Sequence, residues 1–191
     1  MTKKVLNLYA GIGGNRKLWE DVEVTAVELN PEIAAIYHDF FPDDRVIVAD
    51  AHQYLLEHYD DGWDFIWSSP PCQTHSRTNY FLKGKGIIRY PDMSLYEEVI
   101  FLHTYSSSPF CIENVIPYYE PQFGPQIIGR HCLWANFSIH PIRQKKDEIG
   151  KMCGRNQKAH RKSLEERNAV NPKLGKHIFD CAFKLKQEKL F

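Results

Sequence analysis

The 191-residue sequence has no run of eighteen uncharged apolar residues, so nothing in it predicts a membrane span. It also lacks any Cys-x-x-Cys pair, because its five cysteines stand far apart, at positions 72, 111, 132, 153 and 181. That spacing excludes the usual zinc sites, and we expect no metal. The basic start of the chain is not followed by a long apolar run, which argues against a secretory signal. Together these absences predict a cytoplasmic protein that does not bind a membrane.

The sequence also lacks an overall charge, since 24 basic residues balance 24 acidic ones, but the two signs are unevenly distributed. Residues 1–70 carry 5 Lys/Arg and 13 Asp/Glu, whereas residues 138–191 carry 14 basic and 6 acidic residues. A basic quarter on a neutral protein indicates an anionic partner, with nucleic acid the first candidate. A solvated helix face is an equally good explanation of the charge alone.

Short apolar runs alternate with helical patterns along the first 115 residues. We expect strands at 5–9, 24–27, 46–48, 63–67 and 110–112, with a further strand at 132–137. Helices are expected at 31–40, after Asp50, at 92–106 and at about 172–190. This alternation predicts an α/β fold, a Rossmann-like doubly wound and mostly parallel sheet with helices on both faces. The length and the lack of a linker predict a single domain over residues 1–191.

The unusual residues of the sequence stand where the expected strands end. They are the turn Gly11–Gly14, the acids Glu28 and Asp50, the Pro70–Cys72 segment and the Glu113–Asn114 pair. In parallel sheets, ligands bind beyond the carboxyl ends of the strands. We therefore interpret these five strand ends as parts of one site.

The glycine turn and Glu28, at the first two strand ends, indicate that the site binds a nucleoside. Glycines between a strand and an expected helix let the chain approach a ligand closely, and the helix N-terminus offers free N–H groups. Glu28 stands 17 residues after Gly11, where a carboxylate commonly accepts hydrogen bonds from ribose hydroxyls. A purely structural tight turn is the alternative, and the full G-x-G-x-x-G pattern is missing.

The next two ends indicate nucleophilic chemistry. Pro70 and Pro71 fix the backbone directly before Cys72, which points to a rigidly held thiolate nucleophile. Glu113 supplies a carboxylic acid at the neighbouring strand end. Such a pair suits attack on an electron-poor ring, with sulfur adding to carbon while the acid protonates a ring nitrogen. The other four cysteines are expected to be buried apolar residues.

Four segments resemble, in order, the motifs of DNA (cytosine-C5)-methyltransferases. They are Leu8–Gly14, Pro70–Gln73 with its Pro-Pro-Cys-Gln, the Glu-Asn-Val of Glu113–Val115 and the late segment Arg167–Pro172. The resemblance spans nearly the whole chain, and the second and third motifs are its most specific part. It implies the class I methyltransferase form of the fold, with S-adenosylmethionine as cofactor and S-adenosylhomocysteine as its product.

The resemblance also assigns roles to single residues. Tyr9 would stack on the adenine, Cys72 would attack C6 of a cytosine in DNA, and Glu113 would protonate N3. The residues implied to bind the cofactor are Tyr9, Ala10, Gly11, Ile12, Gly13, Gly14, Glu28, Leu29, Asp50, Ala51, Pro70, Asn168 and Val170.

The target cytosine would have to be flipped out of the duplex. Residues 74–90 would then form a mobile loop that closes over the DNA, with cations for the phosphates. The residues expected to contact DNA are Gln73, Ser76, Arg77, Lys83, Lys85, Arg89, Asn114, Arg143, Lys145 and Lys146.

The sequence departs from the family pattern at Asn7, which replaces an acidic residue, and at Arg167, which replaces a glycine, and two further departures bear more directly on the function. Either Arg130 or His131 stands where the family has a catalytic Arg that contacts the cytosine oxygen, and the sequence does not choose between them. The region that normally holds a target-recognition domain is only a short basic insertion, residues 138–167, with 9 basic and 4 acidic residues. We therefore expect short or relaxed sequence specificity in a monomer, or a protein partner that supplies the recognition.

Two other functions remain open at this stage. One is a catalytically silent relative that binds DNA or protein, which the intact Cys72 and Glu113 argue against. The other is a methyltransferase that acts on RNA or on free cytosine nucleotides, which the short insertion would suit.

Overall fold

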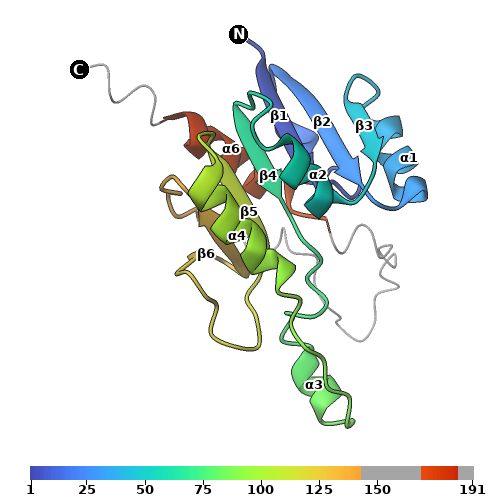
Figure 1. Ribbon diagram of the computed structural model, residues 1–191, viewed down its shortest axis with the longest axis vertical. Helices are drawn as coiled ribbons and strands as arrows, with labels where there is room; N and C mark the ends of the chain where they lie inside the picture. Colours follow the sequence, from blue (N-terminus) through green and yellow to red (C-terminus); the bar gives the residue numbers. More distant parts are fainter. Residues whose placement is uncertain (143–168, 185–191) are drawn as a thin grey trace, which may run out of the picture.

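The protein was analysed as a computed structural model, which describes residues 1–142 and 169–184. Strands and helices alternate over the first part of this range, as the apolar pattern predicts (Figure 1). The strands are β1 (Lys3–Leu8), β2 (Val22–Glu28), β3 (Arg45–Val48), β4 (Phe65–Ser68), β5 (Phe110–Val115), β6 (Gln126–Ile128) and β7 (His131–Ala135). The helices are α1 (Pro31–Phe40), α2 (Ala51–His58), α3 (Asn79–Lys83), α4 (Ser94–Tyr105) and α6 (Pro172–Lys184), with a 3-10 turn η1 (Arg16–Leu18).

The strands form one seven-stranded sheet in the order β3-β2-β1-β4-β5-β7-β6. β1 to β5 pair in parallel with one another, whereas β7 pairs antiparallel with both β5 and β6. The chain order reverses at β1, so strand ends on either side of that point open a crevice. This is the Rossmann-like, doubly wound and mostly parallel fold that the sequence predicts.

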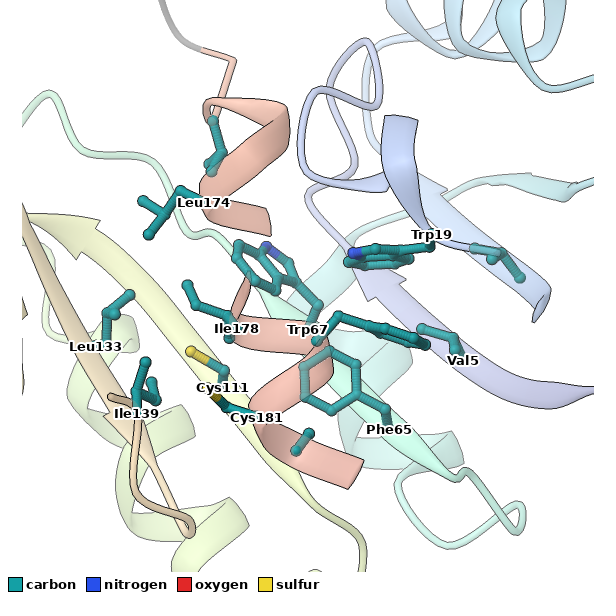
Figure 2. Close-up of a cluster of buried hydrophobic side chains, with 14 of the residues drawn as sticks. Val5, Trp19, Phe65, Trp67, Cys111, Leu133, Ile139, Leu174, Ile178 and Cys181 are labelled. Atoms are coloured by element: carbon teal, nitrogen blue, oxygen red, sulfur yellow. The ribbon is translucent and has the colours of Figure 1, made fainter. Parts of the chain in front are cut away.

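Helices cover both faces of the sheet, and each face has its own hydrophobic core. On one face, α6 packs on the central strands, and Ile178 and Cys181 point toward Phe65, Trp67 and Cys111 (Figure 2). Trp19 stacks on Phe179 of α6 in the same core, with ring centroids 5.2 Å apart. On the other face, α2 and α4 cover side chains that include Leu6, Ile66 and Ile112. The alternation of side chains along each strand distributes apolar residues to both faces, which is why these strands are almost continuously apolar.

Two details of the sequence prediction are wrong. The sequence predicts an α-helix directly after the glycine turn, but the chain forms only the three-residue η1 there, so no long helix presents its N-terminus to a ligand. The sequence also predicts that Tyr9 ends the first strand, yet β1 stops at Leu8, because Tyr9 adopts a left-handed backbone conformation with φ of 54°. The late motif is present as Ala169 to Pro172, which leads into α6, while Asn168 lies outside the described residues.

No helix within residues 1–142 and 169–184 is both long and apolar enough to cross a membrane. The same residues contain no cluster of three or more His, Cys, Asp or Glu side chains that could hold a metal ion.

Candidate active site

The carboxyl ends of β1, β2, β4 and β5 surround one cavity of about 1170 Å³. This volume is sufficient for a nucleoside-bearing cofactor together with a base, since pockets for drug-sized ligands measure roughly 300–1,000 Å³. The predicted site residues that line it are Tyr9, Ala10, Gly11, Ile12, Gly14, Glu28, Leu29, Asp50, Ala51, Pro70, Cys72, Gln73, Glu113, Asn114, Arg130, His131 and Val170. The structure thus brings together predicted site residues that are spread over more than 150 residues of sequence, from Tyr9 to Val170.

The glycine turn is shaped by close backbone approaches. Gly11 and Gly13 have positive φ angles of 54° and 77°, which L side chains rarely adopt. A Cβ on Gly14 would lie 2.6 Å from the backbone oxygen of Val170, so the late motif packs directly on this turn. Val170 is buried at this contact. The two ends of the chain therefore build the same wall of the cavity.

Glu28 is fixed at the rim by two backbone donors. The amide of Gly11 donates to Oε2 at 3.0 Å, and the amide of Asn30 donates to Oε1 at 3.0 Å. Each carboxylate oxygen has a further lone pair, so Glu28 can still accept hydrogen bonds from a diol. Asp50 stands at the next strand end, where its Oδ1 caps α2 by accepting from the amide of Gln53 at 3.0 Å. Glu28, predicted to accept from the ribose, and Asp50, implied by the resemblance to bind the cofactor, are thus both oriented at the cavity.

A buried carboxylate that the sequence analysis missed lies beneath this half of the cavity. Glu98 of α4 is 1% exposed, and its Oε1 accepts from the hydroxyl of Tyr9 at 2.6 Å. Ser68 donates to Oε2 at 2.6 Å, and Nδ1 of His52 lies 3.1 Å from Oε1. Hydrogen bonding to Glu98 raises the pKa of His52, against the effect of burial. Burial and the Glu98 carboxylate raise the pKa of Tyr9, so its hydroxyl stays a donor.

A sequence signal for Glu98 did exist. Leu95, Val99 and Leu102 form the buried stripe of α4, and position 98 falls on that stripe by helical spacing. An acid on an apolar stripe needs partners, which Tyr9 and Ser68 supply.

Cys72 follows the two prolines and is half-buried at the cavity. Burial raises the pKa of its thiol, and the neighbouring Glu113 carboxylate raises it further, while the positive charge of Arg130 lowers it. Cys72 is more exposed than Cys111, Cys132 and Cys181, which are buried as predicted. Cys153 lies outside the described residues.

Glu113 is held by side chains on both sides. Its Oε1 lies 2.6 Å from Nδ1 of His131, and its Oε2 accepts from the Ser69 hydroxyl at 3.1 Å. Ser69 is in turn oriented by the indole N–H of Trp67, which donates to its oxygen at 2.7 Å. Glu113 and His131 are each 7% exposed. The carboxyl group is therefore presented in one fixed orientation.

The structure also separates the two candidates that the sequence left open. His131 and Glu113 lie on the same face of the antiparallel β5–β7 pair, so His131 reaches Glu113 from within the strand. Arg130 is exposed in the turn before β7, where its side chain lines the cavity. His131 thus stands beside the acid, while Arg130 supplies positive charge at the cavity rim.

Asn114 connects two segments of the site by hydrogen bonds. Its amide donates to the backbone oxygen of Pro70 at 2.9 Å, and its Oδ1 accepts from the amide of Val115 at 2.9 Å. These bonds tie the loop of Cys72 to the strand of Glu113. A contact between Asn114 and DNA stays a prediction.

Of the remaining residues predicted to contact DNA, Gln73 lines the cavity and the others lie beyond it or outside the described residues. Gln73, Arg77, Lys83, Lys85 and Arg89 are exposed, whereas the Ser76 hydroxyl accepts from that of Thr78 at 3.0 Å. Arg143, Lys145, Lys146 and most of the insertion 138–167 lie outside the described residues.

The sequence model of the C-5 cytosine-specific DNA methylase family matches residues 3–122, which is more than half of the chain. The chain belongs to this family. S-adenosylmethionine is the cofactor of this family, and the fixed Glu28 and the glycine turn suit a nucleoside.

Individual relatives match less of the chain. A tRNA (cytosine(38)-C(5))-methyltransferase of Spodoptera frugiperda is 33% identical over 89 residues, which are 43% of this chain and 26% of the relative. The chain therefore spans about a quarter of that curated relative's length.

Solved structures with a similar arrangement include two methyltransferases. The S. pombe Dnmt2 methyltransferase matches with a TM-score of 0.48 and 20% identity, over 64% of this chain and 37% of that one. A mutant of the Spodoptera frugiperda DNMT2 protein matches with a TM-score of 0.41 and 26% identity, over 60% and 36%.

Proposed function

We propose that this protein transfers a methyl group from S-adenosylmethionine to C5 of a cytosine in nucleic acid, through a covalent bond between Cys72 and C6. The observation that carries the proposal is the convergence of Cys72, the fixed acid Glu113 and the oriented Glu28 on one cavity of sufficient size. Family membership supports the reaction class, and the substrate polymer and the residue roles are the proposal.

The reaction begins at Cys72. Its thiolate adds to C6, the Sγ–C6 bond forms, and the electron pair of the C5–C6 double bond shifts to C5 and is delocalised through C4 to N3. Glu113 donates a proton or a short hydrogen bond to N3, which accepts the displaced charge and leaves C5 electron-rich. The cofactor supplies a methyl group on positively charged sulfur. C5 takes that methyl group and leaves S-adenosylhomocysteine. Loss of the C5 proton, with cleavage of the Sγ–C6 bond and return of the N3 proton to Glu113, then restores the ring and the thiolate.

The neighbours of Glu113 prepare it for this step. A carboxyl group must carry a proton, or share one, to assist at N3. His131, whose Nδ1 lies 2.6 Å away, holds one carboxyl oxygen of Glu113 in place. Ser69 keeps the other carboxyl oxygen in place. Arg130 favours the thiolate form of Cys72 because its positive charge lowers the thiol pKa.

DNA is the first candidate substrate, since the family is described by its action on DNA. A base in a duplex would have to be flipped to reach the cavity. RNA is the second candidate, favoured by the 33% identity with a tRNA cytosine methyltransferase over 89 residues.

Transfer of tritium from methyl-labelled S-adenosylmethionine tests the proposal. Duplex DNA, transfer RNA and dCTP are offered in parallel, with Glu113→Gln as a variant that keeps the shape of the site but lacks the acid. We expect label in a polymer with the natural protein and a loss of roughly 10²–10⁴-fold with the variant. Label in dCTP alone, or no label in any of the three, would contradict the proposal.

A further inference from the structure

A projecting segment after the nucleophile loop is the most unusual surface of the molecule. Residues 77–90, here called the arm, extend away from the sheet, with α3 near the far end (Figure 1). The base of the arm is tied to Cys72, whose backbone oxygen accepts from the amides of His75 and Ser76 at 3.1 and 2.9 Å. The arm therefore starts at the reacting thiol and leads outward from it.

The arm is held by defined contacts. The hydroxyl of Tyr80 donates to the backbone oxygen of Tyr118 at 2.5 Å, and the hydroxyl of Tyr118 donates to the backbone oxygen of Arg89 at 3.3 Å. The rings of Tyr80 and Tyr118 meet edge to face with centroids 6.0 Å apart. Ser76 forms a β-bridge with Pro117 at the base. These contacts hold both sides of the arm against the segment that follows β5.

Large apolar side chains on the arm face solvent. Phe81 is 78% exposed, Ile88 82% and Tyr90 91%, and Tyr80 and Ile87 are also exposed. Single exposed apolar residues are ordinary, but five within fourteen residues mark a binding surface. Three of the five are aromatic, so the surface can stack on flat rings.

The positive charge of the arm indicates which class of partner it binds. Arg77, Lys83, Lys85 and Arg89 are all exposed, and residues 65–91 include no Asp or Glu. A partner that matches this surface carries regular negative charge and presents flat apolar faces. A duplex offers phosphates but hides its base faces in the stack, whereas an unpaired polynucleotide offers both.

We propose that the arm binds unpaired nucleotides next to the target cytosine, with bases stacked on Phe81 and Tyr90 and phosphates held by the lysines. The proposal rests on the proposed function, because the arm would feed the cavity at Cys72. It adds that the preferred substrate is a single-stranded or looped segment, in which no base pair has to be broken.

Fluorescence anisotropy with the full chain tests the arm without any turnover. The probes are a labelled cytosine-containing strand, as DNA and as RNA, and the same strands annealed to their complements. Phe81→Ala combined with Tyr90→Ala should weaken binding of the unpaired strands by at least about 30-fold, since stacking contributes roughly 1–3 kcal/mol per base and two stacked bases are lost. The slope of log affinity against log salt should stay unchanged.

Two variants serve as controls. Lys83→Gln combined with Lys85→Gln should weaken binding and also flatten the salt slope, by up to about 0.7 for each phosphate of a single strand that is no longer neutralised. Phe40→Ala on α1 removes a ring that is 62% exposed but distant in sequence from the arm, and should leave binding unchanged. The DNA and RNA probes show which polymer the arm prefers.

Other outcomes would overturn the proposal. Equal loss for paired and unpaired strands, or tighter binding of the duplex, would show that the arm does not recognise unpaired bases. Unchanged nucleic-acid affinity together with a loss of self-association in sedimentation would assign the arm to protein contact. The proposed function fails separately, if the label transfer described above finds no methylated polymer even though the arm binds unpaired strands.

Discussion

Removal of the buried Glu98 carboxylate tests how the cofactor half of the cavity is held. In Glu98→Ala the hydroxyls of Ser68 and Tyr9 lose an acceptor 2.6 Å away, and His52 loses one at 3.1 Å. A buried donor left without a partner costs roughly 1–3 kcal/mol. Relief of the desolvated charge offsets part of that cost. We expect the free energy of unfolding to fall by about 2–4 kcal/mol.

Two variants on the same helix sharpen this test. Glu98→Gln keeps one oxygen that accepts from Tyr9, so it should recover most of the loss. Glu97→Ala removes an exposed carboxylate 3.4 Å from Nε2 of His52, and should change stability by at most about 0.5 kcal/mol. Urea unfolding followed by tryptophan fluorescence measures all three. A Glu98→Ala protein as stable as Glu97→Ala would refute the role given to this network.

The same network predicts a pH dependence with a definite sign. Glu98 raises the pKa of His52, so the stability that protonated His52 contributes is complete below its unfolded pKa. That contribution disappears as pH rises through the folded pKa. The pH dependence should be weaker in Glu98→Ala, because Glu98 is the main group that raises the pKa of His52, and the Glu97 and Asp50 carboxylates remain.

Three further predictions concern cofactor, chemistry and substrate. Glu28→Ala should weaken S-adenosylmethionine binding in calorimetry by about 1–3 kcal/mol, because a diol loses its charged acceptor; unchanged affinity would place the ribose elsewhere. The single-turnover rate of methyl transfer should rise with pH above neutrality, because burial and the Glu113 carboxylate raise the pKa of the Cys72 thiol; a flat profile would contradict a thiol that must lose its proton. Neutralising Arg143, Lys145 and Lys146 of the 138–167 insertion should weaken DNA binding about equally for all sequences and flatten the salt slope by up to about 0.9 for each phosphate that is no longer neutralised; an altered choice of cytosines would show that the insertion contacts bases.

The location of the candidate site at the strand ends was predictable from sequence, because the residues at those positions are unusual for the ends of strands. A glycine turn after an apolar strand, an acid at the next strand end and a Cys after two prolines all stand where expected strands end. Parallel strands then bring such residues to one edge, whatever their separation in the chain. The cavity that contains Gly11, Glu28 and Cys72 confirms that inference.

Other features depend on contacts that no local pattern encodes. The 3-10 turn after Gly14 arises where the late Val170 segment and α6 pack on it, and a Cβ on Gly175 would lie 2.3 Å from the backbone oxygen of Asn15. The pairing of Glu113 with His131 requires the antiparallel register of β5 and β7. Side-chain partners across a sheet follow from register, which the sequence alone left open at Arg130 and His131.

Covalent capture of the substrate tests the central claim most directly. In an oligonucleotide with 5-fluorocytosine, Cys72 can add to C6 and C5 can take the methyl group, but fluorine cannot leave C5 as the proton does. The Sγ–C6 bond therefore persists. With S-adenosylmethionine present, intact-mass spectrometry should find one methylated oligonucleotide joined to the protein, and peptide mapping should place it on Cys72. Cys72→Ser should form no adduct and still bind the cofactor with unchanged affinity. An adduct on another residue, or methyl transfer by the Ser variant at the natural rate, would contradict the assignment of Cys72 as the nucleophile.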